Sequence, residues 1–196
     1  VATTQGLKMH GGVPVEAIKE PNMEGLKEGM KNLDRHIRNL QGFGQTVVVC
    51  FNRFAADTDE EIAFCREHCA EMGIGFAVNN AFNEGGAGAE ELAHLVVDTI
   101  ENKPSAPLQF AYTDEQSIED KAKAVVQKVY GGKGVTFTPA AKKMLQKIEE
   151  LGLSHYPICI AKTQFSFSAD QKAYGVPEGF NIAIRDVVIN QGSEFI

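Results

Sequence analysis

Apolar residues recur along the chain with two different spacings, and each spacing predicts a different element. Over residues 22–41 they recur every three or four positions, which places them on one face of a helix that Asn22 can cap. The residues on this face are Met23, Leu26, Met30, Leu33, Ile37 and Leu40. Residues 46–51 and 74–78 are instead continuous apolar runs with β-branched members, which is typical of strands buried on both faces of a parallel sheet.

A predicted helix follows each of these strands. Thr58 and Glu61 form a capping box at the start of the first helix. The glycine-rich turn at residues 85–88 leads into the second helix, expected over residues 89–101. Strands that alternate with helices through short loops are characteristic of a parallel sheet, so residues 46–102 predict a parallel β-α-β-α unit.

The second half of the chain carries similar signals after a proline-containing break at residues 103–107. Helices with N-terminal caps are expected over residues 117–130 and 138–152, and strands over residues 157–161 and 181–189. The predicted fold class is therefore α/β, with the parallel β-α-β-α unit followed by a second small α/β (α+β) unit.

We expect three parts along the chain. Residues 1–45 form a leading segment, with an ordered loop over residues 5–21 and then a helix. Residues 46–103 form an α/β domain, and residues 108–196 form a C-terminal α/β domain that is truncated at its end. The first residue is not Met and residues 1–4 resemble a strand entered partway, so we expect a fragment of a longer protein.

Composition and charge exclude several classes of protein. The net charge of −7 disfavours a general binder of nucleic acid or membrane surfaces, because there is no basic excess to meet phosphates. No run approaches the about 18 apolar residues of a membrane-spanning helix. No signal peptide opens the chain, and Cys50, Cys65, Cys69 and Cys159 lack the spacing of a disulfide framework. These features indicate a cytoplasmic protein with reduced thiols.

A metal site is one candidate for chemistry, but core packing is favoured over it. Cys65, His68 and Cys69 lie three and four residues apart, so they share a helix face. A closed zinc site needs four ligands, and no second Cys/His pair lies at a suitable spacing. Buried free cysteines are common.

The glycine turn at residues 85–88 is a candidate site for an anion. However, it has no Gly-Lys-Ser/Thr sequence, and its neighbours are acidic and would repel an anion. A structural turn is therefore favoured.

Aromatic residues follow both strands of the β-α-β-α unit. The loop after the first strand carries Phe54, and the loop after the second carries Phe82. Because the carboxyl ends of parallel strands meet at one edge of a sheet, both rings are expected there. They could stack on a flat heterocycle, or they could form a small satellite core under the two loops. The residues alone leave these alternatives equally open.

Three basic side chains are further candidates for polar contacts with a ligand. Lys8 and His10 lie beside a glycine turn, a setting that suits a polyanion or acid–base chemistry, although a lone histidine is more often structural. Lys162 opens a polar loop that leaves the strand predicted over residues 157–161. It could line a site or simply end that strand.

Several motifs in one order resemble the later part of a known family, the formate–tetrahydrofolate ligases. They are residues 7–14 (LKMHGGVP), Asn52-x-Phe54 with residues 57–59, residues 82–88 (FNEGGAG) and residues 160–168 (IAKTQFSFS). The resemblance extends over essentially the whole chain. It implies an enzyme that makes 10-formyltetrahydrofolate from formate, ATP and tetrahydrofolate through formyl phosphate. It also implies a magnesium–ATP site in a preceding phosphate-loop domain, and a homotetramer.

The resemblance also assigns roles to individual residues. It implies that Phe54 and Phe82 sandwich the heterocycle of the folate, with Val78 as an aliphatic wall; some members have tryptophan in place of Phe82. Ala55 stands where many bacterial members have proline. Residues 190–194 depart from the glycine-rich run that is usual at that point. The resemblance assigns no catalytic residue and no metal ligand to residues 1–196.

Two functions follow as hypotheses. In the first, the chain is the folate-binding portion of the ligase, needs no cofactor of its own and is inactive alone. In the second, it is a non-catalytic module for folate binding or oligomerisation. The length of the natural reading frame would discriminate between them.

Overall fold

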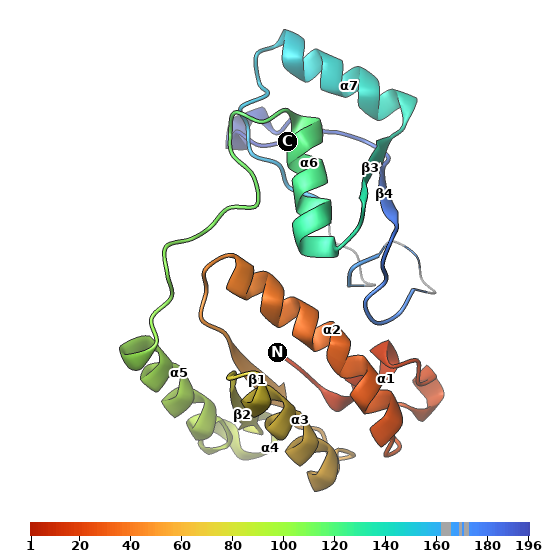
Figure 1. Ribbon diagram of the computed structural model, residues 1–196. Coiled ribbons are helices and arrows are strands. Elements are labelled where there is room, and N and C mark those ends of the chain that lie inside the picture. The colour runs from red at the N-terminus through yellow and green to blue at the C-terminus, as the bar shows by residue number, and fades with distance from the viewer. Residues whose placement is uncertain (162–165, 169, 171–172) are drawn as a thin grey trace. The chain divides into compact units, whose positions relative to one another are not determined.

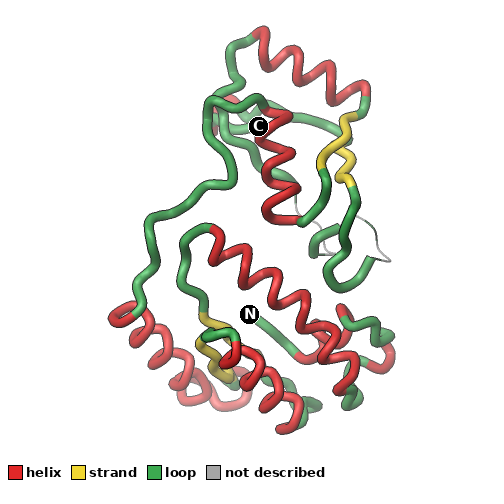
Figure 2. Tube along the Cα trace, viewed as in Figure 1, coloured by secondary structure: helices red, strands yellow, loops and turns green. Residues whose placement is uncertain are grey.

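The computed structural model describes residues 1–161, 166–168, 170 and 173–196. The described chain divides into unit 1, Val1–Gln109, and unit 2, Phe110–Ile196. Figure 1 shows the elements, and Figure 2 shows the long stretch without helix or strand that follows α5. Unit 1 contains α1 (Thr4–His10), a 3-10 turn (Val15–Ala17), α2 (Met23–Gly42), β1 (Val48–Asn52), α3 (Asp59–Glu71), β2 (Gly75–Asn79), α4 (Ala81–Glu84), a 3-10 turn (Gly85–Ala89) and α5 (Glu90–Asn102).

Unit 1 confirms the predicted parallel β-α-β-α arrangement. Strands β1 and β2 pair in parallel, from Val48 opposite Gly75 to Asn52 opposite Asn79. The capping box of α3 is present: the Thr58 hydroxyl accepts a hydrogen bond from the Glu61 N–H, and the Glu61 carboxylate accepts one from the Thr58 N–H. Such reciprocal bonds satisfy backbone donors that the helix itself leaves unpaired.

Helix α2 forms as its apolar spacing predicts, and it covers the core of unit 1. The Asn22 side chain caps it by accepting a hydrogen bond from the Gly25 N–H at 2.8 Å. Leu26, Met30 and Ile37 are buried against the sheet core. Leu40, which the same pattern places on this face, is 46% exposed because it lies in the last turn, beyond the core.

The expectation of an ordered loop over residues 5–21 is wrong in part, because α1 occupies much of it. The Thr3 hydroxyl caps this helix by accepting a hydrogen bond from the Gly6 N–H at 3.0 Å. Figure 1 shows α1 beside α2. A Cβ added at Gly29 would lie 1.8 Å from the Leu7 carbonyl oxygen, so the glycine allows the two helices to approach closely. Residues 1–45, expected as a separate leading segment, therefore pack within unit 1.

Unit 2 also contains parallel strands. Its elements are α6 (Ile118–Val125), a π-helical turn (Val126–Tyr130), β3 (Gly134–Phe137), α7 (Pro139–Glu150), β4 (Asn181–Ile184) and a 3-10 turn (Gln191–Ser193). Strand β3 pairs with β4, from Gly134 opposite Asn181 to Phe137 opposite Ile184. The helices begin at the predicted caps Ser117 and Thr138.

The strands of unit 2 differ from the prediction in three ways. The sequence pattern missed β3, which is short and begins at a glycine. The strand expected over residues 181–189 ends at Ile184, because its partner stops where Thr138 begins to cap α7. Residues 157–161 form no assigned strand. The Tyr112 hydroxyl accepts the Ile158 N–H at 2.9 Å, and the backbone of Ile196 bonds to Pro157 and Cys159.

The structure bears on membrane association in one respect only. Within residues 1–161, 166–168, 170 and 173–196, no helix is both long enough and apolar enough to cross a bilayer.

Glu194 adopts a left-handed backbone conformation, with φ of 52°. A side chain in this conformation costs about 1–2 kcal/mol, whereas glycine adopts it freely at a smaller cost in chain entropy. We therefore expect Glu194→Gly to raise the free energy of unfolding by up to about 1 kcal/mol. Urea denaturation measures this change, and an unchanged or lower midpoint would contradict it.

Candidate functional site

The two phenylalanines singled out in the sequence follow the carboxyl ends of paired strands. Phe54 lies just beyond Asn52, the last residue of β1, and Phe82 lies in α4, just beyond the end of β2. The exposed fraction is 45% for Phe54 and 98% for Phe82. At this exposure Phe82 packs in no satellite core, and its aromatic face is accessible for stacking on a flat ligand.

Hydrogen bonds fix the backbone of the Phe54 loop. The Asp57 carboxylate, which is only 7% exposed, accepts the Phe54 N–H at 2.8 Å and also the hydroxyl of the buried Thr4. The Asp57 N–H donates to the Phe54 carbonyl at 3.0 Å. At the loop surface, Arg53 pairs with Asp59 at 2.9 Å. Ala55 is exposed in the same loop.

In the Phe82 loop, the backbones of Asn80 and Gly88 lie in close contact and close the loop. The Asn80 N–H donates to the Gly88 carbonyl at 2.9 Å. A Cβ added at Gly88 would lie 2.6 Å from the backbone carbon and oxygen of Asn80, so only glycine fits there. Gly85 has a φ of 61°, a conformation that other residues rarely adopt. The glycine-rich turn therefore holds the loop that carries Phe82, as the structural interpretation of this turn expected.

An amide pair joins the two strand ends. The Asn79 side-chain nitrogen donates to the Asn52 side-chain oxygen at 2.9 Å, and the Asn79 side-chain oxygen accepts the Ala81 N–H at 3.1 Å. This pair is not among the candidate site residues predicted from the sequence. Its only signal in the sequence is an asparagine at the end of each predicted strand.

Val78 lies half-buried beside this edge and packs against the core of unit 1. Its N–H donates to the Glu91 carboxylate at 3.1 Å, and the same carboxylate pairs with Arg66 at 2.7 Å. The hydrogen bond from Arg66 holds the pKa of Glu91 below its ordinary value, and the Val78 N–H adds to the effect against the opposing influence of burial. Glu91 is thus a fixed negative charge at the start of α5.

The three basic candidates have different surroundings. Lys8 is fully buried: its ammonium group donates to Glu61 at 3.0 Å and to the Glu20 carbonyl at 2.9 Å, so we interpret it as structural. His10 is partly buried, and burial lowers its pKa, which favours the neutral imidazole at neutral pH. Lys162 lies outside the described residues.

Comparison with known proteins places the chain in one family. The family model for formate–tetrahydrofolate ligase matches residues 1–196. The chain belongs to the formate–tetrahydrofolate ligase family. It is 59% identical over 196 residues to a formate–tetrahydrofolate ligase of Bacteroides fragilis and 62% identical over 196 residues to one of Parabacteroides distasonis. In both cases the match covers 100% of this chain and 35% of the relative.

A ligase of lower sequence identity matches this chain over the same share of its length. The formate–tetrahydrofolate ligase of Porphyromonas gingivalis is 52% identical over 193 residues, which is 98% of this chain and 35% of that protein. The chain thus spans about a third of the length of the curated ligases it matches.

Two of the four cysteines of this ligase-family chain, Cys65 and Cys69, pack in the core, whereas Cys159 is exposed. Cys65 and Cys69 are fully buried, and burial raises the pKa of Cys65 to about 12 and that of Cys69 to about 11, so both thiols stay protonated. His68 instead contacts Asp34 at 2.8 Å. Among the described residues, no group of three or more His, Cys, Asp or Glu side chains is arranged to hold a metal ion.

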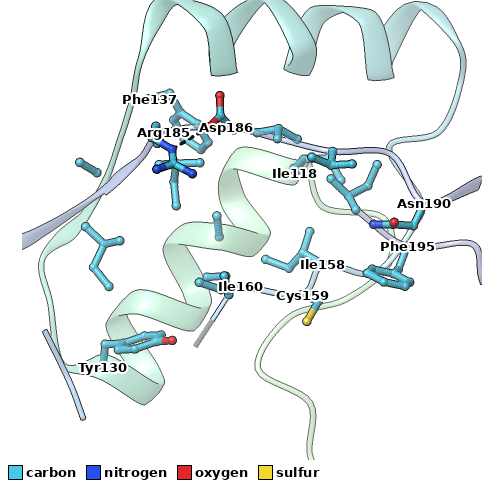
Figure 3. A pocket seen from close by; sticks show the side chains of 18 residues that line it. Ile118, Tyr130, Phe137, Ile158, Cys159, Ile160, Arg185, Asp186, Asn190 and Phe195 are labelled. Atoms are coloured by element: carbon cyan, nitrogen blue, oxygen red, sulfur yellow. Dashed lines mark hydrogen bonds and ion pairs between the residues drawn. The ribbon is translucent and has the colours of Figure 1, made fainter. Parts of the chain in front are cut away.

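Unit 2 of the ligase-family chain contains an apolar cavity of about 600 Å³ (Figure 3). Three isoleucines of its lining also belong to the core of this unit. Ile118 and Ile196 are members of the buried core cluster, and Ile158 packs against that cluster. Arg185 and Asp186 pair at 2.8 Å, so their charges compensate each other at its border. We interpret this cavity as an extension of the unit 2 core. Phe54 and Phe82 belong to unit 1.

Proposed function

We propose that residues 1–196 are the folate-binding part of an ATP-dependent ligase that makes 10-formyltetrahydrofolate from formate and tetrahydrofolate through formyl phosphate. The observation that carries this proposal is the exposure of Phe54 and Phe82 beyond the ends of paired strands in a member of the ligase family. Aromatic faces stack on flat heterocycles, and burying the exposed rings against such a ligand is favourable.

In this proposal, the residues of the chain bind and orient the folate. Phe54 and Phe82 supply stacking faces and Val78 an aliphatic wall, while Ala55 leaves room beside Phe54. Magnesium–ATP binds elsewhere in the complete enzyme, because the chain contains no Gly-Lys-Ser/Thr phosphate-binding loop. By the same family resemblance, we infer that the complete enzyme is a cytoplasmic homotetramer.

A chimeric ligase tests the proposal. In this protein, residues 1–196 replace the matching 196-residue segment of the Bacteroides fragilis ligase, to which they are 59% identical. We expect the chimeric ligase to release ADP continuously only when formate and tetrahydrofolate are both present. We expect the isolated chain to release no ADP under the same conditions.

Two outcomes would contradict these expectations. Formate-dependent release of ADP by the isolated chain would show that it carries its own catalytic site. A chimeric ligase that folds, as judged by its circular dichroism and thermal midpoint, but has no tetrahydrofolate-dependent activity would show that the chain cannot serve as the folate-binding part.

A further inference from the structure

We propose that Thr4 and Asp57 are positioning residues that hold the Phe54 ring in place for tetrahydrofolate. This inference rests on the proposed function, because it concerns how the stacking face is oriented. Neither residue is expected to touch the folate.

The Asp57 carboxylate joins two parts of unit 1 that are far apart in sequence. One oxygen accepts the Thr4 hydroxyl, 53 residues earlier in the chain, and the other accepts the Phe54 N–H at 2.8 Å. Thr4 is fully buried and Asp57 nearly so. A buried carboxylate oxygen without a hydrogen-bond donor destabilises the folded state. The two hydrogen bonds therefore hold the Asp57 carboxylate in one orientation, and the loss of either would allow it to rotate.

Thr4 is itself held in place by the sheet. The Ala2 N–H donates to the Cys50 carbonyl at 2.8 Å, and the Asn52 N–H donates to the Ala2 carbonyl at 2.9 Å, so the start of the chain pairs in parallel with β1. Thr4 lies two residues after Ala2, at the first position of α1. The Thr4 hydroxyl therefore projects from a segment that is tied to the same strand that ends beside Phe54.

The exposed Phe54 ring explains why such support is needed. Because Phe54 is 45% exposed, its ring is packed less tightly than a core residue. The orientation of the ring then depends on the backbone of Phe54. Two hydrogen bonds hold that backbone: the Phe54 N–H donates to the Asp57 carboxylate, and the Asp57 N–H donates to the Phe54 carbonyl. Loss of the Thr4 hydroxyl would free the carboxylate to turn, and the Phe54 N–H would lose its fixed partner.

The experiment uses Thr4→Val in the chimeric ligase, since valine keeps the shape of threonine and removes the hydroxyl. We expect the KM for tetrahydrofolate to rise by about 5- to 30-fold, because a misdirected Phe54 ring loses part of its stacking on the folate. The KM values for ATP and formate should change less than twofold, and Thr4→Ser should restore the tetrahydrofolate KM. Ile37→Val, which trims the same core at a residue on α2, controls for lost stability and should leave all three KM values unchanged.

A double-mutant comparison separates positioning from simple stabilisation. In a Phe54→Ala background, Thr4→Val should raise the tetrahydrofolate KM no further, because the ring it orients is gone. The inference is overturned if Thr4→Val lowers the thermal midpoint but leaves the tetrahydrofolate KM unchanged, or if its effect on KM persists fully without the ring. If Phe54→Ala alone has no effect on this KM, the proposed stacking role of Phe54 fails instead.

Discussion

Lys8→Met is expected to lower the free energy of unfolding of the chain by about 3–5 kcal/mol, the usual cost of removing one partner from a buried ion pair. The side chains of Lys8 and Glu61 are 1% and 2% exposed, and their charged atoms lie 3.0 Å apart. Glu61 also accepts hydrogen bonds from the Asn22 N–H and from Thr58. Removal of the ammonium group would leave the carboxylate buried without its counter-charge.

The matched control is Lys31→Met. Lys31 pairs with Glu28 at 2.6 Å on the surface of α2, where both side chains are more than half exposed. Exposed pairs contribute about 0–1 kcal/mol, so this change should have a small effect. Urea denaturation followed by circular dichroism measures both variants. Equal losses from Lys8→Met and Lys31→Met would show that the buried pair has no special role.

The same ion pair gives the stability a defined dependence on pH. Burial alone would raise the pKa of Glu61, but hydrogen bonds from the Asn22 N–H, Lys8 and Thr58, together with the charge of Lys8, lower it below its ordinary value of 4.5. Because the pKa is lower in the folded state, this stabilisation is complete above pH 4.5 and is lost as the pH falls through the folded pKa. Lys8→Met should reduce the loss of stability on acidification in this range.

Phe54→Ala and Phe82→Ala are each expected to raise the KM of the chimeric ligase for tetrahydrofolate by about 5- to 150-fold. Each change removes one stacking face, worth about 1–3 kcal/mol on the scale of base–aromatic stacking. The kcat should change less, because stacking is shared by the ground and transition states. Phe82→Trp should be tolerated or should lower this KM, since it keeps the stacking face and enlarges it.

Phe110→Ala is the matched control for the ring variants. Phe110 is also a strongly exposed phenylalanine, at 76%, but it lies in unit 2 and follows no strand. Its loss should leave the tetrahydrofolate KM unchanged. If Phe54→Ala or Phe82→Ala lowers the thermal midpoint while the tetrahydrofolate KM stays the same, the ring in question is a packing residue.

Local signals in the sequence were enough to predict most of unit 1. The capping box at Thr58, the cap at Asn22 and the two continuous apolar runs each depend on neighbours within a few residues. Helix α1 was missed because glycines in and around it resemble a loop, whereas Gly11 at its end and Gly29 of α2 allow the two helices to lie in close contact. That contact joins distant segments, and no local pattern predicts it.

The same distinction applies to the candidate site. Chain topology was sufficient to predict that Phe54 and Phe82 follow the ends of parallel strands. The Thr4–Asp57 hydrogen bond could not be predicted, because it joins residues 53 positions apart and neither residue type is unusual at its place. Lys8 shows the same limit: a lysine beside a glycine turn is a candidate for a ligand contact in the sequence, and its buried partner Glu61 is also 53 residues away.

A crystal structure of the chimeric ligase with tetrahydrofolate tests the central claim most directly. We predict that the fused ring system of the folate lies between Phe54 and Phe82, with each phenylalanine ring in van der Waals contact with it at about 3.5–4 Å. Tetrahydrofolate bound elsewhere, with both phenylalanine rings still exposed to solvent, would contradict the assignment of this strand edge as the folate site.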